Sequence, residues 1–333
     1  MRKTEVNRAI ENRLRNNVLY IDIQEALEQM CAELHLMTSS LENQMGEDLS
    51  DLILSGGKRL RPILAFVSYR LAATQTRKDI IPLMCMLELM HTASLIHDDV
   101  VDGADMRRDK PTINKLRGSL EAVQSGDFLL SKAMKLLHIY KGTGINEMLA
   151  DVSYQMTMGE LSQQAMRYKF DLQSANAYYD LINKKTAQLL AASCWCGMVA
   201  GGAEKDKAQA LYRYGEKLGL AFQLRDDLLD YSVKSGKTLG QDIRNGTFTL
   251  PILTLLESGV PHHMYGLLKK KDKTETEVQR VIDYVKETDA IAQVEQKVRQ
   301  YSAAAEHELR IFGAGLEKKA LSELAVSLGE RKA

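Results

Sequence analysis

The chain has 333 residues, and its 44 lysines and arginines balance its 44 aspartates and glutamates, so its formal net charge is zero. This balance gives no overall attraction to nucleic acid or to an anionic membrane, so any phosphate site must be built from local residues. The length allows one large domain or two. Only 5 prolines occur, and Ala, Leu, Met, Glu, Lys and Gln are abundant, a composition that favours helices almost throughout.

Apolar residues at helical spacing predict a succession of helices along the sequence. The predicted ranges are 5–55 (one or two helices), 63–75, 79–101, 115–140, 145–167, 174–201, 204–231, a helix opened by Pro251, and charged amphipathic helices over 273–330. No segment has strand periodicity over more than a few residues, and no repeat or Pro/Ser/Gly linker divides the chain. We therefore expect a single all-α domain over residues 1–333, with a helical tail over 256–333.

The cysteines and the N-terminal segment indicate a reduced, cytoplasmic protein. The cysteines are Cys31, Cys85, Cys194 and Cys196. Their spacing fits neither a zinc site nor a disulfide framework, so we expect buried thiols. The charged start, Met1-Arg-Lys-Thr-Glu, shows no signal peptide. The longest apolar stretch, residues 189–202, has roughly 14 residues, which is too short for a membrane span.

Two aspartate clusters with the pattern D-D-x-x-D are the most informative feature. They comprise Asp98, Asp99 and Asp102 in the first cluster and Asp226, Asp227 and Asp230 in the second. On a helix the first and last aspartates share one face, and the apolar flanks predict that this face looks inward. Burying carboxylates without a counter-ion is costly, and Mg²⁺ held by a few carboxylates usually also binds a phosphate. One cluster alone is typical of a solvated helix face, but two predict facing helices that hold Mg²⁺ and a diphosphate.

Basic residues in two loops predict further phosphate contacts. Lys58, Arg59 and Arg61 follow two glycines, and Arg107 and Arg108 follow the first aspartate cluster. Glycines let a backbone approach a ligand closely, and an arginine offers a bidentate fork to phosphate oxygens. With the aspartates, these groups indicate two phosphate sites, one held by metal and the other by cationic side chains alone.

Several polar residues interrupt otherwise apolar helices. They are His91, Gln163, Lys185, Thr186 and Gln223. A lone histidine or glutamine in such a place is usually a satisfied core residue. Lys185 is harder to dismiss because lysine is seldom buried unpaired, so it could donate to a diphosphate. Thr186 and Gln223 could point oxygen dipoles at a developing cation.

Taken together, these motifs resemble the trans-isoprenyl diphosphate synthases of the polyprenyl synthetase family, especially its medium- and long-chain members. The motifs, over about residues 50–255, are Gly56-Gly-Lys-Arg-Leu-Arg-Pro62, the first cluster with Arg107-Arg108, Gly126-Asp127, Gly159-Glu-Leu-Ser-Gln163, Lys185-Thr186-Ala187, Gly219-Leu-Ala-Phe-Gln223 through Asp230, and Gly236-Lys-Thr-Leu-Gly-Gln-Asp242. The resemblance implies a bundle of about ten or more helices around a deep central cavity.

The resemblance also implies roles for individual residues. Asp98, Asp102 and Asp226 would ligate three Mg²⁺ ions around the allylic diphosphate, supported by Asp99, Asp227 and Asp230. The allylic diphosphate would contact Arg107, Lys185 and Lys237, and isopentenyl diphosphate would contact Lys58, Arg61, His91 and Arg108. Thr186 and Gln223 would face the allylic cation. The implied partners are isopentenyl diphosphate and farnesyl or geranylgeranyl diphosphate, in a homodimer or a heterodimer.

Two positions depart from the family pattern. The family usually has a lysine where this chain has Thr247, and a glycine after the arginine pair where this chain has Asp109. The first change removes a cation and the second adds a negative charge near a proposed phosphate site. Both favour a second interpretation, a weakly active subunit of a heteromeric synthase, although neither removes a metal ligand.

Product length should depend on what blocks the tunnel below the first aspartate cluster. The residues one turn before Asp98 are Ala93 and Ser94, which are small, and the next turn offers Leu89 and Met90. One helical turn is about 5.4 Å, close to one isoprene unit. We therefore expect a product of roughly C30 to C40. A side chain from another helix that closes the tunnel early would instead give C15 or C20.

Overall fold

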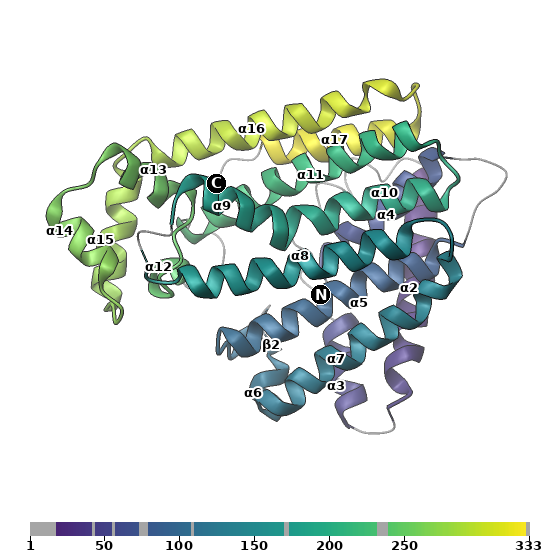
Figure 1. Ribbon diagram of the computed structural model, residues 1–333, viewed down its shortest axis with the longest axis horizontal. Helices are drawn as coiled ribbons and strands as arrows, with labels where there is room; N and C mark the ends of the chain where they lie inside the picture. The colour runs from purple at the N-terminus through teal and green to yellow at the C-terminus, as the bar shows by residue number, and fades with distance from the viewer. Residues whose placement is uncertain are drawn as a thin grey trace. The chain divides into compact units, whose positions relative to one another are not determined.

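The computed structural model describes residues 18–41, 44–54, 57–72, 79–107, 110–169, 173–231 and 239–330. The prediction of an all-α fold is confirmed (Figure 1). Within these ranges the only strands are β1 (Met106–Arg107) and β2 (Lys110–Pro111), which pair antiparallel with Arg107 opposite Lys110. This short hairpin follows the first aspartate cluster directly.

The helices follow the chain in the order that the periodicity predicted, with some differences in their bounds. They are α2 (Val18–Ser39), α3 (Gln44–Leu54), α4 (Leu60–Ala72), α5 (Ile81–Val101), α6 (Ile113–Arg117), α7 (Ser119–Leu136), η1 (Leu137–Tyr140), α8 (Ile145–Met166), α9 (Ala175–Ile182), η3 (Asn183–Ala187), α10 (Gln188–Ala200), α11 (Lys205–Leu228), η4 (Leu229–Tyr231), α12 (Gln241–Arg244), α13 (Leu250–Ser258), α14 (His262–Lys269), α15 (Glu275–Lys286), α16 (Ala290–Glu308), η6 (Leu309–Ile311) and α17 (Leu316–Glu330).

Local chemistry explains where several helices begin and end. Thr112 caps α6 by accepting a hydrogen bond from the N–H of Lys115 at 3.0 Å, and Thr274 and Glu277 form a capping box at α15,. The prediction of one helix over 115–140 was wrong, because Gly118 adopts a φ of 86° that only glycine tolerates easily. The chain therefore turns there, and α6 and α7 are separate.

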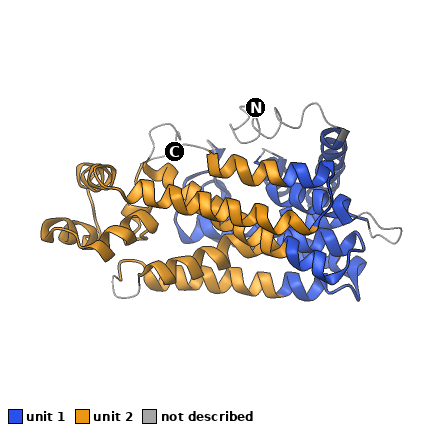
Figure 2. Cartoon of the chain, turned by 90° about the horizontal axis from the view of Figure 1, so that it is seen from above, with its two compact units in different colours: residues 1–150, 192–211, 312–321 blue, residues 151–191, 212–311, 322–333 orange. Residues whose placement is uncertain are grey.

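The chain divides into two compact units (Figure 2). Unit 1 comprises residues 1–150, 192–211 and 312–321, and unit 2 comprises residues 151–191, 212–311 and 322–333. In unit 1, α5 packs against α2, α4 and α7, and most of its residues are buried. In unit 2, a core is built mainly from α11, α13, α15 and α16. That the two units act as one domain stays a prediction.

The prediction of buried thiols is confirmed for three of the four cysteines. Cys85, Cys194 and Cys196 are buried and Cys31 is half-buried, and all four are free. Burial raises the pKa of Cys85 and of Cys194 to about 12, so these thiols stay protonated and unreactive. In the part of the chain that the structure describes, no helix combines the length and hydrophobicity needed to cross a bilayer.

Gly197 allows α10 and α4 to approach closely in unit 1. A Cβ atom added there would lie 2.2 Å from the carbonyl oxygen of Ala65. We expect Gly197→Ala to lower the free energy of unfolding by about 1–3 kcal/mol, because the helix backbones must separate. Urea denaturation measures this loss. Gly266→Ala is the matched control, since nothing lies within 4 Å of a Cβ at this position in α14; its stability should stay equal or rise. Equal stabilities for the two variants would contradict the prediction.

Candidate active site

The first aspartate cluster occupies the C-terminal end of α5, in unit 1. Asp99 is buried and Asp98 is half-buried, whereas Asp102 is the C-cap residue, and its N–H bonds to the Asp98 carbonyl at 2.8 Å. Asp102 is exposed, so the prediction of an inward-facing cluster was wrong for this member, because the helix ends there. A helix C-terminus carries partial negative charge. Carboxylates at this position therefore gain more than usual from a bound cation.

Arg107 of β1 neutralises the middle aspartate of this cluster. Its Nε lies 2.9 Å from each carboxylate oxygen of Asp99, and its Nη2 lies 2.8 Å from Oδ1. Such a fork-shaped contact between a guanidinium and a carboxylate is strong and directional. The structure thus gives Arg107 an aspartate partner that the sequence did not indicate. Arg108 and Asp109 lie outside the described residues.

The three other residues proposed for isopentenyl diphosphate lie on α4, α5 and the segment before α4. Lys58 lies two residues before α4, Arg61 is in its first turn, and His91 is on α5. All three are half-buried. Their placement in unit 1 with the first aspartate cluster is consistent with one substrate site, and their contact with a diphosphate stays a prediction.

The residues proposed to set product length line up along α5. Leu89, Met90 and Ala93 are buried, and Ser94 is half-buried. The Ser94 hydroxyl donates to the carbonyl of His91 at 2.8 Å, so it is satisfied within its own helix. Ser94 can therefore border an apolar chain without an unsatisfied hydroxyl.

The second aspartate cluster lies in unit 2, at the C-terminal end of α11, and its middle member is buried in a hydrogen-bonded network. Tyr178 of α9 donates to Oδ2 of Asp227, and Gln223 Nε2 donates to Oδ1 at 2.7 Å. Thr186 Oγ1 in turn donates to Gln223 Oε1 at 2.7 Å. The structure therefore links Thr186 and Gln223 to Asp227, a partner that the sequence did not predict for them. It also adds Tyr178, which nothing in the sequence distinguished from a core tyrosine.

The network fixes the direction of each hydrogen bond. An ionised Asp227 only accepts, so Gln223 must turn its NH₂ group toward the carboxylate and its oxygen toward Thr186. Thr186 must then donate. Burial raises the pKa of Asp227 to about 7, although the hydrogen bonds from Tyr178 and Gln223 work in the opposite direction. Burial and the neighbouring Asp227 also raise the pKa of Tyr178.

Asp230, the last member of the second cluster, is hydrogen-bonded to the start of α12. Its Oδ2 accepts from the N–H of Asp242 at 3.0 Å, in the first turn of α12, where helix N–H groups lack intrahelical partners. Asp226 and Asp230 are both half-buried. Lys237 falls in the segment between Tyr231 and Leu239, outside the described residues.

Lys185 and Thr186 lie in η3, a single π-helical turn between α9 and α10. Such turns are rare and are frequently found at functional sites. Gly159 and Gly219 make room for the turn. A Cβ atom at Gly159 would lie 2.8 Å from Lys185 Cγ, and one at Gly219 would lie 2.5 Å from Ala187 Cα.

The amine of Lys185 has two acceptors on α8. It pairs with Glu160 and donates to Oε1 of Gln163. Burial alone would raise the pKa of Glu160, but the charge and hydrogen bond of Lys185 hold this pKa below its usual value. The sequence indicated a cationic Lys185 near a diphosphate, but not its carboxylate partner. The ion pair with Glu160 and the hydrogen bond to Gln163 hold the Lys185 side chain in place.

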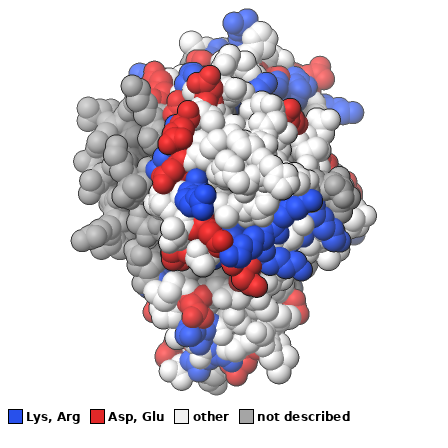
Figure 3. Space-filling view, turned by 90° about the vertical axis from the view of Figure 1, so that its left-hand side faces the viewer, with Lys and Arg blue, Asp and Glu red and all other residues white. Residues whose placement is uncertain are grey.

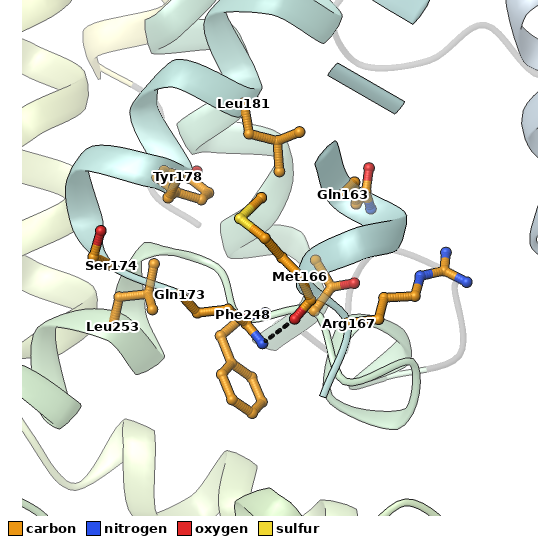
Figure 4. Close-up of a pocket in the computed structure, with 10 residues that line it drawn as sticks. Gln163, Met166, Arg167, Gln173, Ser174, Tyr178, Leu181, Phe248 and Leu253 are labelled. Carbon is orange, nitrogen blue, oxygen red and sulfur yellow. Dashed lines mark hydrogen bonds between the residues drawn. The ribbon is translucent and has the colours of Figure 1, made fainter. Parts of the chain in front are cut away.

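A pocket in unit 2 adjoins this network (Figure 4). It contains about 280 Å³ of unfilled space, part of which is open solvent. Its lining residues are Gln163, Met166, Arg167, Gln173, Ser174, Tyr178, Leu181, Thr247, Phe248 and Leu253. Thr247, where the family usually has lysine, has a buried Oγ1 without a hydrogen-bond partner. The pocket wall thus includes residues that contact Asp227 and Lys185.

The aspartates suit a hard divalent cation that is shared with a ligand. Among the described residues, no three His, Cys, Asp or Glu side chains converge as they would in an all-protein metal site. Asp98 and Asp102 instead offer two carboxylates one turn apart at a helix C-terminus. Mg²⁺ typically takes one or two carboxylates and completes its shell with waters and substrate phosphates. The donor set therefore fits Mg²⁺ bound together with a diphosphate.

Comparisons with known proteins agree with this chemistry. A model of the polyprenyl synthetase family matches residues 42–285. The heptaprenyl diphosphate synthase component 2 of Bacillus subtilis is 31% identical over 284 residues, which are 84% of this chain and 81% of that protein. The octaprenyl diphosphate synthase of Escherichia coli is 34% identical over 238 residues, 71% of each chain. A crystal structure of a decaprenyl diphosphate synthase from Rhodobacter capsulatus superposes with a TM-score of 0.87 at 29% identity, covering 94% of this chain and 98% of that one.

The raised pKa of Asp227 predicts a pH-dependent stability. An aspartate in an unfolded chain has a pKa of about 3.9, so between that pH and about 7 the native state binds more protons than the unfolded state. Stability therefore falls as pH rises through this range, with a limiting slope of about 1.4 kcal/mol per pH unit. We expect Asp227→Asn to remove this contribution, so that its stability relative to wild type rises with pH. Urea denaturation in metal-free buffer from pH 4.5 to 8 measures it. Parallel curves would contradict the assignment.

Proposed function

Since this chain belongs to the polyprenyl synthetase family and is a trans-prenyltransferase, we propose that it extends an allylic diphosphate by Mg²⁺-dependent, head-to-tail condensation with isopentenyl diphosphate. The observation that carries the proposal is the pair of D-D-x-x-D clusters, each at the C-terminal end of a helix and each with its middle aspartate held by neighbouring donors. We propose that Asp98 and Asp102 of the first cluster and Asp226 of the second hold the cations. Diphosphate release is the chemistry that such an arrangement favours.

The reaction needs charge stabilisation rather than a protein nucleophile. Asp98, Asp102 and Asp226 would hold Mg²⁺, and the bound Mg²⁺ would neutralise the negative charge on the departing diphosphate. Lys185, fixed by Glu160 and Gln163, contributes a positive charge to the same group. The oxygens of Thr186 and Gln223 stabilise the allylic cation by their dipoles. The isopentenyl double bond attacks this cation, and the proton is lost to the released diphosphate.

The cationic residues divide between the two substrates. Lys58, Arg61, His91 and Arg108 bind the diphosphate of isopentenyl diphosphate, and Arg107, Lys185 and Lys237 bind the allylic diphosphate. The primer is farnesyl or geranylgeranyl diphosphate. Arg107 would act on the allylic side through Asp99 as well as directly, because the two side chains form one charge pair.

The comparisons support a product of medium or long chain length, and we propose roughly C30 to C40. The relatives include proteins named heptaprenyl, octaprenyl and nonaprenyl diphosphate synthases, from Bacillus subtilis, Escherichia coli and Mycobacterium tuberculosis. A short product of C15 or C20 is the alternative. It is favoured by the similarity to a solved geranylgeranyl pyrophosphate synthase of Lactobacillus brevis, with a TM-score of 0.86 at 27% identity.

We propose that the protein works as a homodimer in the cytoplasm. In unit 1, Leu120 and Val123 are exposed three residues apart on α7, and a second copy would cover such an apolar face. The heteromeric alternative is supported by two relatives, in Bacillus subtilis and Geobacillus stearothermophilus, that are named component 2. Nucleic acid is not a proposed partner. On the face drawn in Figure 3, acidic side chains border the largest group of basic ones, and smaller groups of both signs are interspersed over the rest.

The assay that tests the function uses the purified chain alone. With Mg²⁺, farnesyl diphosphate and radiolabelled isopentenyl diphosphate, it should give an extended prenyl diphosphate whose length chromatography reports. Asp226→Ala should lower kcat at least about 1,000-fold, because it removes a metal ligand in the transition state. It should not lower the stability of the fold, because it removes one of three clustered like charges. An inactive wild-type chain would favour the heteromeric alternative, and an unaffected variant would contradict the metal site.

The product-length proposal is tested at Ala93. Its side chain is buried on the face of α5 proposed to line the tunnel. Ala93→Phe should leave the first condensations intact and stop growth early, giving mainly C15 to C20 products. Overpacking would instead cost about 1–3 kcal/mol of stability without changing the product distribution. Ser94→Phe, at the half-buried neighbouring position, provides a second variant. Full-length product from both folded variants would refute the proposed tunnel face.

A further inference from the structure

Arg59 has an unusual backbone conformation in a functionally placed segment of unit 1. Its φ is 45°, in the left-handed region, where the Cβ atom of an L-residue crowds the following carbonyl. It directly precedes α4, and its carbonyl accepts a hydrogen bond from the N–H of Ile63 at 3.0 Å. A residue keeps such a conformation only when its surroundings hold it there.

The side chain of Arg59 provides that restraint by joining three helices. Nη1 pairs with the carboxylate of Glu88 on α5, and Nη2 donates to the carbonyl of Ile53 in the last turn of α3. Carbonyls in a last helical turn lack an intrahelical partner, so this contact satisfies one. The Arg59 and Glu88 side chains are only 11% and 9% exposed. The ion pair is therefore weakly screened, and loss of either partner would leave a buried charge.

The contacts of Arg59 connect the two parts of the proposed isopentenyl diphosphate site. Lys58 and Arg61 lie one residue before it and two residues after it, and Glu88 lies three residues before His91 on α5. Because Arg59 is tied to Glu88, its neighbours are held against the same turn of α5 that carries His91.

We propose that Arg59 is a positioning residue that, through Glu88, holds Lys58 and Arg61 in register with His91 for binding the diphosphate of isopentenyl diphosphate. The inference rests on the proposed function and assigns Arg59 no contact with substrate. The strained backbone turns the Arg59 side chain into the protein, so that the cationic residues on either side of it serve the ligand. A purely structural role for the pair would affect stability but would not separate the two substrates.

Arg59→Lys tests the inference, because lysine keeps the charge but cannot bond Glu88 and the Ile53 carbonyl with one rigid fork. We expect the KM for isopentenyl diphosphate to rise about tenfold to hundredfold, the range that displaced binding groups produce. The KM for farnesyl diphosphate should change less than about twofold. Steady-state kinetics with each substrate varied in turn, together with thermal unfolding, gives both readouts.

Two further variants keep the test decisive. The first is the double variant Arg59→Gly with Glu88→Leu. Glycine accepts the left-handed φ, and leucine leaves no unpaired carboxylate, so this variant should fold and still show the raised KM for isopentenyl diphosphate. Arg70→Lys is the control. Arg70 also lies on α4, but at its C-terminal end, away from the proposed site, where it pairs with Asp22 of α2. It should lower stability at most and leave both KM values unchanged.

The outcomes separate this inference from the function itself. Equal rises in both KM values, or a loss of stability with unchanged KM values, would overturn the positioning role while the enzyme remained a prenyltransferase. A wild-type chain that neither turns over isopentenyl diphosphate nor binds it in calorimetry would overturn the proposed function instead. Raised KM for isopentenyl diphosphate in both Arg59 variants, with Arg70→Lys unaffected, would support the inference.

Discussion

The structure depends on aspartates placed at the C-terminal ends of α5 and α11, where the helix dipole already carries negative charge. The surrounding groups reduce this repulsion in different ways. Asp99 has a full positive charge beside it, from Arg107, whereas Asp227 has two neutral donors and a raised pKa. Asp230 receives a backbone N–H. A divalent cation bound with its diphosphate would add positive charge at the same two helix ends, so ligand binding would act on the electrostatic balance that these contacts set.

The two units contribute different chemistry to the proposed reaction. The part in unit 1 is rich in cations, with Lys58 and Arg61 at the start of α4 and Arg107 paired with Asp99 of the first aspartate cluster. The part in unit 2 combines the second cluster with oriented dipoles from Thr186 and Gln223 and one fixed cation, Lys185. An oriented dipole stabilises a short-lived carbocation without forming a bond that would trap it. This division suits a reaction in which the allylic substrate becomes a cation, while isopentenyl diphosphate stays intact until its double bond attacks that cation.

The sequence predicted the fold class and most helices, because apolar periodicity and the helix-forming composition agree over long segments. It also gave Thr186 and Gln223 one role, near a developing cation, but it did not predict that they are hydrogen-bonded to each other and to Asp227. It could not predict the break at Gly118, because the break depends on the positive φ of that single residue. It could not predict the π-helical turn either, because no local sequence pattern indicates one. Arg107, Tyr178 and Glu88 find their partners through tertiary contacts, and the spacing of charges along the chain does not encode them.

The π-helical turn η3 also constrains how this protein can vary in length. A π turn contains one residue more than the α-helical turn it replaces, so loss of one residue within it would restore an α-helical turn and shift the side chains of that turn by one position, about 100° around the axis. Lys185 and Thr186 would then turn away from Gln163 and Gln223. On the C-terminal side, Ala191 would still present its backbone to Gly215, where a Cβ would lie 2.7 Å from it. A one-residue deletion within 183–187 should therefore remove the contacts of Lys185 and Thr186 while it preserves the packing of the helices around them.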